Sequence, residues 1–171
     1  MKGGKKSPFL LQYFMQNTDI EKLVEKGLLE LEFTDVYIVD LKVNNNKIEV
    51  FLDSDEGITF LKCQRLSRFL EAIFDESKIF GEKYTLDVSS AGVGSSLKYL
   101  KQYKKNIGRT IEVKYADNQK TKGKLKDVVD NLIYVEYETK VKEGKKNKKV
   151  IIVDEVKFED IIESKIKISF N

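Results

Sequence analysis

An uncharged stretch of small residues follows a short strand in the middle of the chain, and it constrains the fold more than any other feature. Residues 84–89 (YTLDVS) alternate apolar and polar side chains, as a half-buried strand does. Residues 90–96 (SAGVGSS) then contain no charge and little bulk. Such a stretch fits three roles: a phosphate-binding turn, a site for a nucleophilic serine, or a connection between two domains.

The segments before this stretch predict an α/β layer. Residues 19–33 and 61–76 carry apolar side chains at helical spacing, and Thr59 is a suitable N-cap for the second helix. Residues 35–43 and 47–53 alternate on either side of an asparagine turn and predict a hairpin. The order helix, hairpin, helix, strand indicates two helices on one face of a three-stranded sheet. The acidic turn at residues 53–57 (DSDEG) lacks the remaining ligands of a calcium loop and is interpreted as solvated.

The segments after the stretch predict a short basic helix over residues 97–107 and then several closely spaced strands. This pattern is typical of a small barrel of SH3 or Sm type. The predicted fold class is therefore α+β, with an N-terminal α/β layer followed by an SH3/Sm-like β-barrel. The predicted divisions are a flexible arm (1–14), an N-terminal domain (15–90), a hinge (91–96) and a basic domain (97–171), and Met15 is an alternative start.

Charge divides the chain at the same place. Residues 15–97 contain 16 acidic and 9 basic residues, a net charge of −7, whereas residues 98–149 contain 16 basic and 7 acidic residues, a net charge of +9. The overall charge of +3 hides this asymmetry. It predicts a polyanionic partner for the second half and a basic protein partner for the first half.

The residue inventory disfavours most enzyme classes. The chain has no histidine and one cysteine, so it lacks the ligands of an ordinary zinc site and the base of a histidine-dependent triad. A Ser-Lys pair or carboxylate-bound Mg²⁺ would be the remaining routes to hydrolysis. Cys63 lies in an apolar helical pattern and is predicted to be a core residue rather than a reactive thiol. We expect no enzyme activity and no cofactor. No segment reaches the ~20 apolar residues of a membrane span, and we expect a cytoplasmic location.

Two basic elements are candidates for binding RNA. On the predicted helix, Lys98, Lys101 and Lys105 share a face, because they lie three and four residues apart. Each element alone also fits a solvated surface or a mobile loop, and together they favour nucleic-acid binding. The exposed tyrosines are interpreted as strand packing rather than as base-stacking groups. The candidate residues are Lys98, Lys101, Lys104, Lys105 and Arg109 in the first element, and Lys142, Lys145, Lys146, Lys148 and Lys149 in the second.

The residues of the small stretch favour the connector over the other two roles. Ser89 and Ser90 have no histidine to activate them, and the glycines are not followed by the Gly-Lys-Ser/Thr sequence of a phosphate-binding loop. Gly92 and Gly94 permit a positive φ, which suits a tight connection between domains.

The segment from Tyr84 to Leu97 resembles the bacterial ribosome maturation factor RimP family. The hallmark of that family is a strand that ends in Val-Ser-Ser-Pro-Gly before Leu-Asp-Arg-Pro-Leu, and Ser89, Ser90, Gly92 and Leu97 match it. Residues 57–76 are similar to the family's second helix, and the hairpin occupies the corresponding place. Ala91, Gly94, Ser95 and Ser96 depart from the hallmark, so roles of the replaced proline, acid and arginine do not transfer.

The resemblance implies a non-enzymatic, two-domain assembly factor. Its expected partners are the immature small ribosomal subunit, ribosomal RNA and a basic small-subunit ribosomal protein, and we expect it to act as a monomer in the cytoplasm. The alternative is a stand-alone Sm-like RNA-binding module without a ribosomal role.

Overall fold

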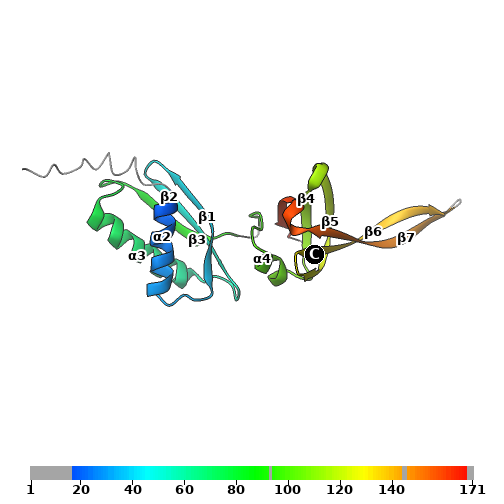
Figure 1. Ribbon diagram of the computed structural model, residues 1–171, viewed down its shortest axis with the longest axis horizontal. Helices are drawn as coiled ribbons and strands as arrows, with labels where there is room; N and C mark the ends of the chain where they lie inside the picture. The colour runs from blue at the N-terminus through cyan, green and yellow to red at the C-terminus, as the bar shows by residue number, and fades with distance from the viewer. Residues whose placement is uncertain (1–16, 93, 144–145, 169–171) are drawn as a thin grey trace, which may run out of the picture. The chain divides into compact units, whose positions relative to one another are not determined.

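A computed structural model describes residues 17–92, 94–143 and 146–168 of the chain (Figure 1). The chain divides into two compact units between Ala91 and Gly92, and each unit has its own core. The predicted arm at residues 1–14, the alternative start Met15 and the candidate Lys145 lie outside the described residues. Within the described ranges, the helices are too short or too polar to cross a membrane.

The first unit contains two helices and a three-stranded sheet, as the sequence predicts. β1 and β2 form an antiparallel hairpin, and β3 pairs with β2 in parallel, which gives the sheet order β1-β2-β3. A parallel strand needs a crossover connection rather than a tight turn, and α3 provides it. The elements are α2 (Asn17–Glu30), β1 (Val36–Asn44), β2 (Lys47–Ser54), α3 (Phe60–Ser77) and β3 (Thr85–Ser90).

The core of the first unit lies between this sheet and its helices. Ile48, Val50 and Leu52 alternate along β2 and are fully buried in one cluster with residues of α2 and α3, which cover the same face of the sheet (Figure 1). Cys63 belongs to this cluster with 7% of its surface exposed, and burial raises the pKa of its thiol. The prediction that Cys63 is a core residue is therefore confirmed.

Local signals set the limits of α3. The Thr59 side chain accepts a hydrogen bond from the Lys62 amide at 3.3 Å, which confirms the predicted N-cap. Lys78 ends the helix in a left-handed conformation with φ 55°, and its amide bonds to the Phe74 carbonyl. The Lys62 ammonium also contacts both carboxylate oxygens of Asp35 at 2.7 and 2.9 Å, and this hydrogen bond lowers the pKa of Asp35. The first turn of α3 is thus tied to the start of the sheet.

The second unit contains a five-stranded antiparallel sheet with the order β7-β6-β5-β4-β8. Its core gathers Ile111 and Val113 from β4, Leu125 from β5, and Ile133 and Val135 from β6. Tyr103 of the short helix α4 is fully buried against these strands. The elements are α4 (Leu100–Lys105), β4 (Thr110–Tyr115), β5 (Gln119–Val129), β6 (Leu132–Glu143), β7 (Lys146–Lys157) and β8 (Ile161–Ile166), with 3₁₀ turns at Ala116–Asn118 and Phe158–Asp160.

The sheet of the second unit is not closed into a barrel, contrary to the sequence prediction. Closure would require β7 and β8 to pair, and no ladder joins them in the described ranges. β7 pairs with β6 along its whole length. The outer edge of β8 is partly occupied, because Ser96 forms a bridge with Lys165 and the Leu97 amide bonds to the Ser164 carbonyl at 3.0 Å.

We predict that Gly123→Ala destabilises the second unit. A Cβ atom at this position of β5 would lie 2.2 Å from the Glu136 carbonyl oxygen of β6, so the two backbones would have to separate. Overpacking of this kind costs about 1 to 3 kcal/mol. Urea unfolding of the full chain measures the loss.

Gly94→Ala is the matched control. Gly94 has no positive φ, and no atom lies within 4 Å of the position that its Cβ would take, so the variant should unfold as the wild type does. Equal stability of the two variants would contradict the packing argument.

Candidate nucleic-acid interface

The basic helix is shorter than predicted. α4 begins at Leu100, because the Gln102 side-chain oxygen accepts hydrogen bonds from the amides of Lys98 and Tyr99 at 2.8 and 3.1 Å and fixes the turn before the helix. Lys98 therefore lies outside α4. The prediction that it shares a helical face with Lys101 and Lys105 is wrong. Lys101 and Lys105 remain one turn apart on the exposed side of α4.

A buried polar contact fixes α4 to the sheet. The Tyr103 hydroxyl hydrogen-bonds to the Ser164 hydroxyl of β8, and both residues are almost completely buried. The Tyr103 ring packs edge-on against Phe158, with ring centres 5.8 Å apart. Burial raises the pKa of Tyr103, so its hydroxyl stays protonated and keeps a hydrogen to donate. The lysines of α4 are thus displayed from a fixed helix.

Arg109, which follows α4, is hydrogen-bonded both to the end of that helix and to the middle of β5. The Arg109 carbonyl accepts a hydrogen bond from the Leu125 amide at 2.9 Å, and its guanidinium donates to the Asn106 side chain at 3.0 Å. Asn106 in turn donates to the Gln102 carbonyl at 2.7 Å inside the unit. Arg109 therefore joins the α4 lysines to a strand that carries further lysines.

Four lysines of β5 form a stripe that is absent from the sequence-based candidates. Residues at alternate positions of a strand share a face, and here the intervening Thr121 and Leu125 point inward and are buried. The four lysines are all exposed. The signal is visible in the sequence as lysine at every second position of QKTKGKLKD. This lysine stripe consists of Lys120, Lys122, Lys124 and Lys126.

Glutamates on neighbouring strands neutralise part of this charge. Glu136 contacts Lys126 of the stripe at 2.8 Å. Glu112 contacts Lys167 at 3.0 Å and lies opposite Lys122 of the stripe, to which it is also attracted. Each hydrogen bond to a lysine lowers the pKa of its glutamate, so both carboxylates are ionised at neutral pH. Among the described residues, no salt bridge involves Lys120, Lys122 or Lys124. These three lysines are the part of the stripe most available to an external anion.

The predicted second basic element is a long two-stranded ribbon. Its outer part, residues 137–143 of β6 and 146–152 of β7, pairs only with itself, because β5 pairs with β6 no further than Glu136. We name this part the distal ribbon. Residues paired across the strands share a face, so Lys140 and Lys149 lie on one face with Lys142, and Lys146 and Lys148 lie on the other. The lysines are therefore divided between two faces.

Two lysines of the distal ribbon form exposed ion pairs. Lys149 contacts Glu138 at 2.8 Å, and this hydrogen bond raises the pKa of Lys149. Lys148 contacts Glu143 at 3.5 Å. Exposed pairs of this kind contribute little to stability and exchange readily with another anion. Lys142 and Lys146 are exposed near the end of the ribbon.

The residues of the small stretch divide between the two units. Ser89 and Ser90 are the last residues of β3 and lie opposite Phe51 and Leu52 of β2. Leu97 packs against the second core. Gly92 has φ +71°, and no atom lies within 4 Å of the position that its Cβ would take, so a positive φ rather than crowding requires glycine there.

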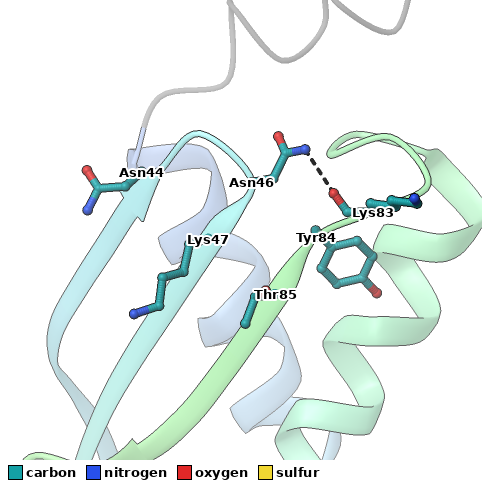
Figure 2. A pocket seen from close by; sticks show the side chains of 6 residues that line it. All are labelled: Asn44, Asn46, Lys47, Lys83, Tyr84 and Thr85. Carbon is teal, nitrogen blue, oxygen red and sulfur yellow. Dashed lines mark hydrogen bonds between the residues drawn. The ribbon is translucent and has the colours of Figure 1, made fainter.

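A shallow pocket of about 410 Å³ lies beside the β1–β2 turn (Figure 2). The Asn46 side chain donates a hydrogen bond to the Lys83 carbonyl at 2.8 Å, and the Asn46 carbonyl accepts one from the Thr85 amide. Lys47, which also lines the pocket, is paired with Glu49 at 2.8 Å. These contacts position the start of β3. No cluster of three acidic or cysteine side chains suited to a metal ion occurs in the part of the chain that the structure describes.

Comparison with known proteins identifies the family. The RimP N-terminal domain family matches residues 20–94, which span the first unit and its exit. A ribosome maturation factor RimP of Flavobacterium psychrophilum is 34% identical over 154 residues, which cover 88% of this chain and 96% of that protein. The chain belongs to the RimP family. The resemblance predicted from residues 84–97 is thereby confirmed.

Other RimP proteins match over similar lengths. The ribosome maturation factor RimP of Christiangramia forsetii is 35% identical over 159 residues, 91% of this chain and all of that protein. That of Cytophaga hutchinsonii is 32% identical over 151 residues, 81% of this chain and 89% of that protein. Both matches extend beyond the first unit, so the likeness to RimP proteins includes the unit that carries α4 and the lysine stripe.

We predict that Tyr103→Phe lowers the free energy of unfolding of this RimP-family protein by about 1 to 3 kcal/mol, because the buried Ser164 hydroxyl loses its partner. The double variant Tyr103→Phe/Ser164→Ala should recover part of that loss, since replacing both partners by apolar groups removes the unsatisfied hydroxyl. Urea unfolding of the wild type, both single variants and the double variant gives the coupling energy. Additive effects would show that the two hydroxyls do not interact.

Proposed function

We propose that this protein binds the immature small ribosomal subunit and promotes its maturation without catalysing a reaction. The name of its relatives, ribosome maturation factor, supports a ribosomal role. The observation that carries the proposal is the segregation of charge, with a net charge of −7 over residues 15–97 and +9 over residues 98–149. Each sign suits one component of a ribonucleoprotein.

The second unit is proposed to bind ribosomal RNA. Its candidates among the described residues lie on or beside three connected elements, because Arg109 links α4 to β5 and β5 pairs with the base of the β6–β7 hairpin. Lysine contacts to phosphates give an affinity that depends on salt and little on sequence, which suits transient binding to a large RNA. The proposed contacts are Lys98, Lys101, Lys104, Lys105, Arg109, Lys142, Lys145, Lys146, Lys148 and Lys149, together with the lysine stripe.

The first unit, which has the negative net charge, is proposed to contact a basic ribosomal protein.

Residues 91–96 are proposed to be the hinge between the two units. The Ala91 amide bonds to the Leu52 carbonyl of the first unit at 2.9 Å, whereas Ser96 pairs with β8 of the second unit. The connection is therefore anchored at both ends, and Gly92 lies between the anchors. A protein that binds RNA and a ribosomal protein at the same time favours their association with each other. It does so without making or breaking a covalent bond.

We predict that charge removal on the second unit flattens the salt dependence of binding to immature small subunits. Replacing Lys120, Lys122 and Lys124 by Gln should reduce the slope of log affinity against log salt concentration by about 2 to 3, since each lost phosphate contact removes about 0.7 to 0.9. The variant Lys101, Lys104 and Lys105→Gln tests α4 in the same way. Binding of the labelled full chain to purified immature subunits at several salt concentrations gives the slopes.

The matched control replaces three exposed lysines of the first unit, Lys22, Lys26 and Lys83, by Gln. It changes the net charge by the same amount as each of the two variants of the second unit. Its slope should stay close to that of the wild type. Slopes that fall equally in all three variants would contradict a localised RNA surface.

Sedimentation with ribosomal particles separates the proposal from a stand-alone Sm-like RNA-binding module. The proposed function predicts that the protein sediments with immature small subunits in preference to large subunits at equal RNA concentration. A general RNA-binding module would sediment equally with both.

A further inference from the structure

β3 is an edge strand with one side of its backbone unpaired. The amides of Thr85 and Ala91 donate to carbonyls of the β1–β2 turn and of β2, at 2.8 and 2.9 Å. The amide and carbonyl of one strand residue point to the same side, and successive residues alternate. The backbone groups of Leu86, Val88 and Ser90 therefore face the outer edge, where no described strand pairs with them.

A groove of about 520 Å³ runs between this edge and α3. Leu86 and Val88 lie on its β3 side, and they pack partly against the first core. Phe60, which is 81% exposed, and Cys63 lie on its α3 side. The rest of that side is polar and consists of Gln64, Ser67, Arg68 and Glu71. An exposed aromatic ring beside an unpaired strand edge is a surface that natural proteins usually cover or blunt. This α3–β3 groove thus offers both backbone hydrogen bonds and apolar contact.

The face of the sheet away from the helices carries acidic residues at the position next to the edge. Asp87 lies directly opposite Glu49 in the parallel pairing of β3 with β2, so the two acidic residues occupy neighbouring positions on one face of the sheet. Like charges opposite each other on neighbouring strands are unfavourable. Lys47 contacts Glu49 at 2.8 Å and also attracts Asp87 electrostatically, although no salt bridge in the described part of the chain involves Asp87. A basic side chain on an added strand would lie next to Asp87 on its outer side and add a second cation there.

We propose that the edge of β3 and the α3–β3 groove bind an extended basic segment of a protein partner as a fourth strand. The segment gains main-chain hydrogen bonds from Leu86, Val88 and Ser90, and its side chains alternate between two faces. Those level with Leu86 and Val88 enter the groove and should be apolar. Those level with Asp87 lie on the face away from the helices, next to its carboxylate, and should be lysine or arginine. The inference rests on the proposed function for its partner, a basic ribosomal protein, and gives that partner a docking site.

The test uses the full chain and a synthetic peptide of about eight alternating lysine and valine residues, a common strand length. Amide hydrogen exchange measured by NMR should slow at Leu86, Val88 and Ser90 when the peptide binds. The amides of Asp87 and Ser89 already face β2 and should change little. The same peptide N-methylated at alternate residues cannot form the ladder and should not slow the exchange. Exchange at the three outward amides that is unaffected by the lysine-valine peptide would overturn the proposal.

Charge variants test the register. Asp87→Lys should weaken binding of the lysine-valine peptide by about tenfold and strengthen binding of a glutamate-valine peptide, because the attraction is reversed. Glu25→Lys is the matched control, since Glu25 is exposed on α2 and the change in net charge is the same. Equal weakening by the two variants would attribute binding to the overall charge and overturn the docking site.

The peptide assay contains no ribosomal component, so its outcome is independent of the proposed function. Loss of peptide binding with intact binding to immature subunits would refute only the groove. Peptide binding by a protein that does not bind immature subunits would refute only the ribosomal role.

Discussion

The parallel pairing of β3 with β2 determines the layout of the first unit. A parallel neighbour cannot follow β2 through a tight turn, so α3 must cross over the sheet between them. The same crossover packs α3 against Ile48, Val50 and Leu52 and completes the core. It also leaves β3 at the edge of the sheet, where its outer backbone groups lack a described partner strand. The parallel pairing therefore determines three features of the first unit: its core, the point where the chain leaves the sheet after Ser90, and the α3–β3 groove.

The second unit uses the two-residue period of strands to separate a core face from a charged face. Thr121 and Leu125 are buried, while the lysine stripe alternates with them on the exposed face. The hydroxyl contact between Tyr103 and Ser164 fixes α4 to the same sheet, and Arg109 joins α4 to β5. The second unit thus exposes basic side chains on α4, on β5 and on the distal ribbon. Under the proposed function, many weak phosphate contacts on such a surface would give reversible binding, which suits release from a maturing particle.

Much of the first unit was predictable from the sequence, because its signals are local. Helical spacing placed α3, the side chain of Thr59 capped it, and the alternation of Ile48, Val50 and Leu52 identified the buried face of β2. Parallel pairing of β3 was not predictable from its own residues, since it depends on the crossover. The segment from Tyr84 to Leu97, together with the helix at residues 57–76 and the hairpin before it, indicated the RimP family.

The second unit was less predictable, because its outcome depends on contacts between distant residues. Lys98 fits the helical spacing, yet the Gln102 side chain caps the backbone there and starts α4 at Leu100. The barrel prediction failed at closure, because β7 and β8 do not pair in the described ranges and residues 96–97 occupy part of the outer edge of β8. The lysine stripe is a different case, since its lysines alternate along β5 and do not form the run of adjacent charges that marks the other basic elements.

Crosslinking of the full chain to immature small subunits in cells, followed by mass spectrometry of the crosslinked residues, tests the proposed function most directly. The proposed function predicts that RNA crosslinks map to the second unit, on α4, the lysine stripe and the distal ribbon, and that protein crosslinks map to the first unit. RNA crosslinks concentrated on the first unit, with none on the lysine stripe or α4, would contradict it.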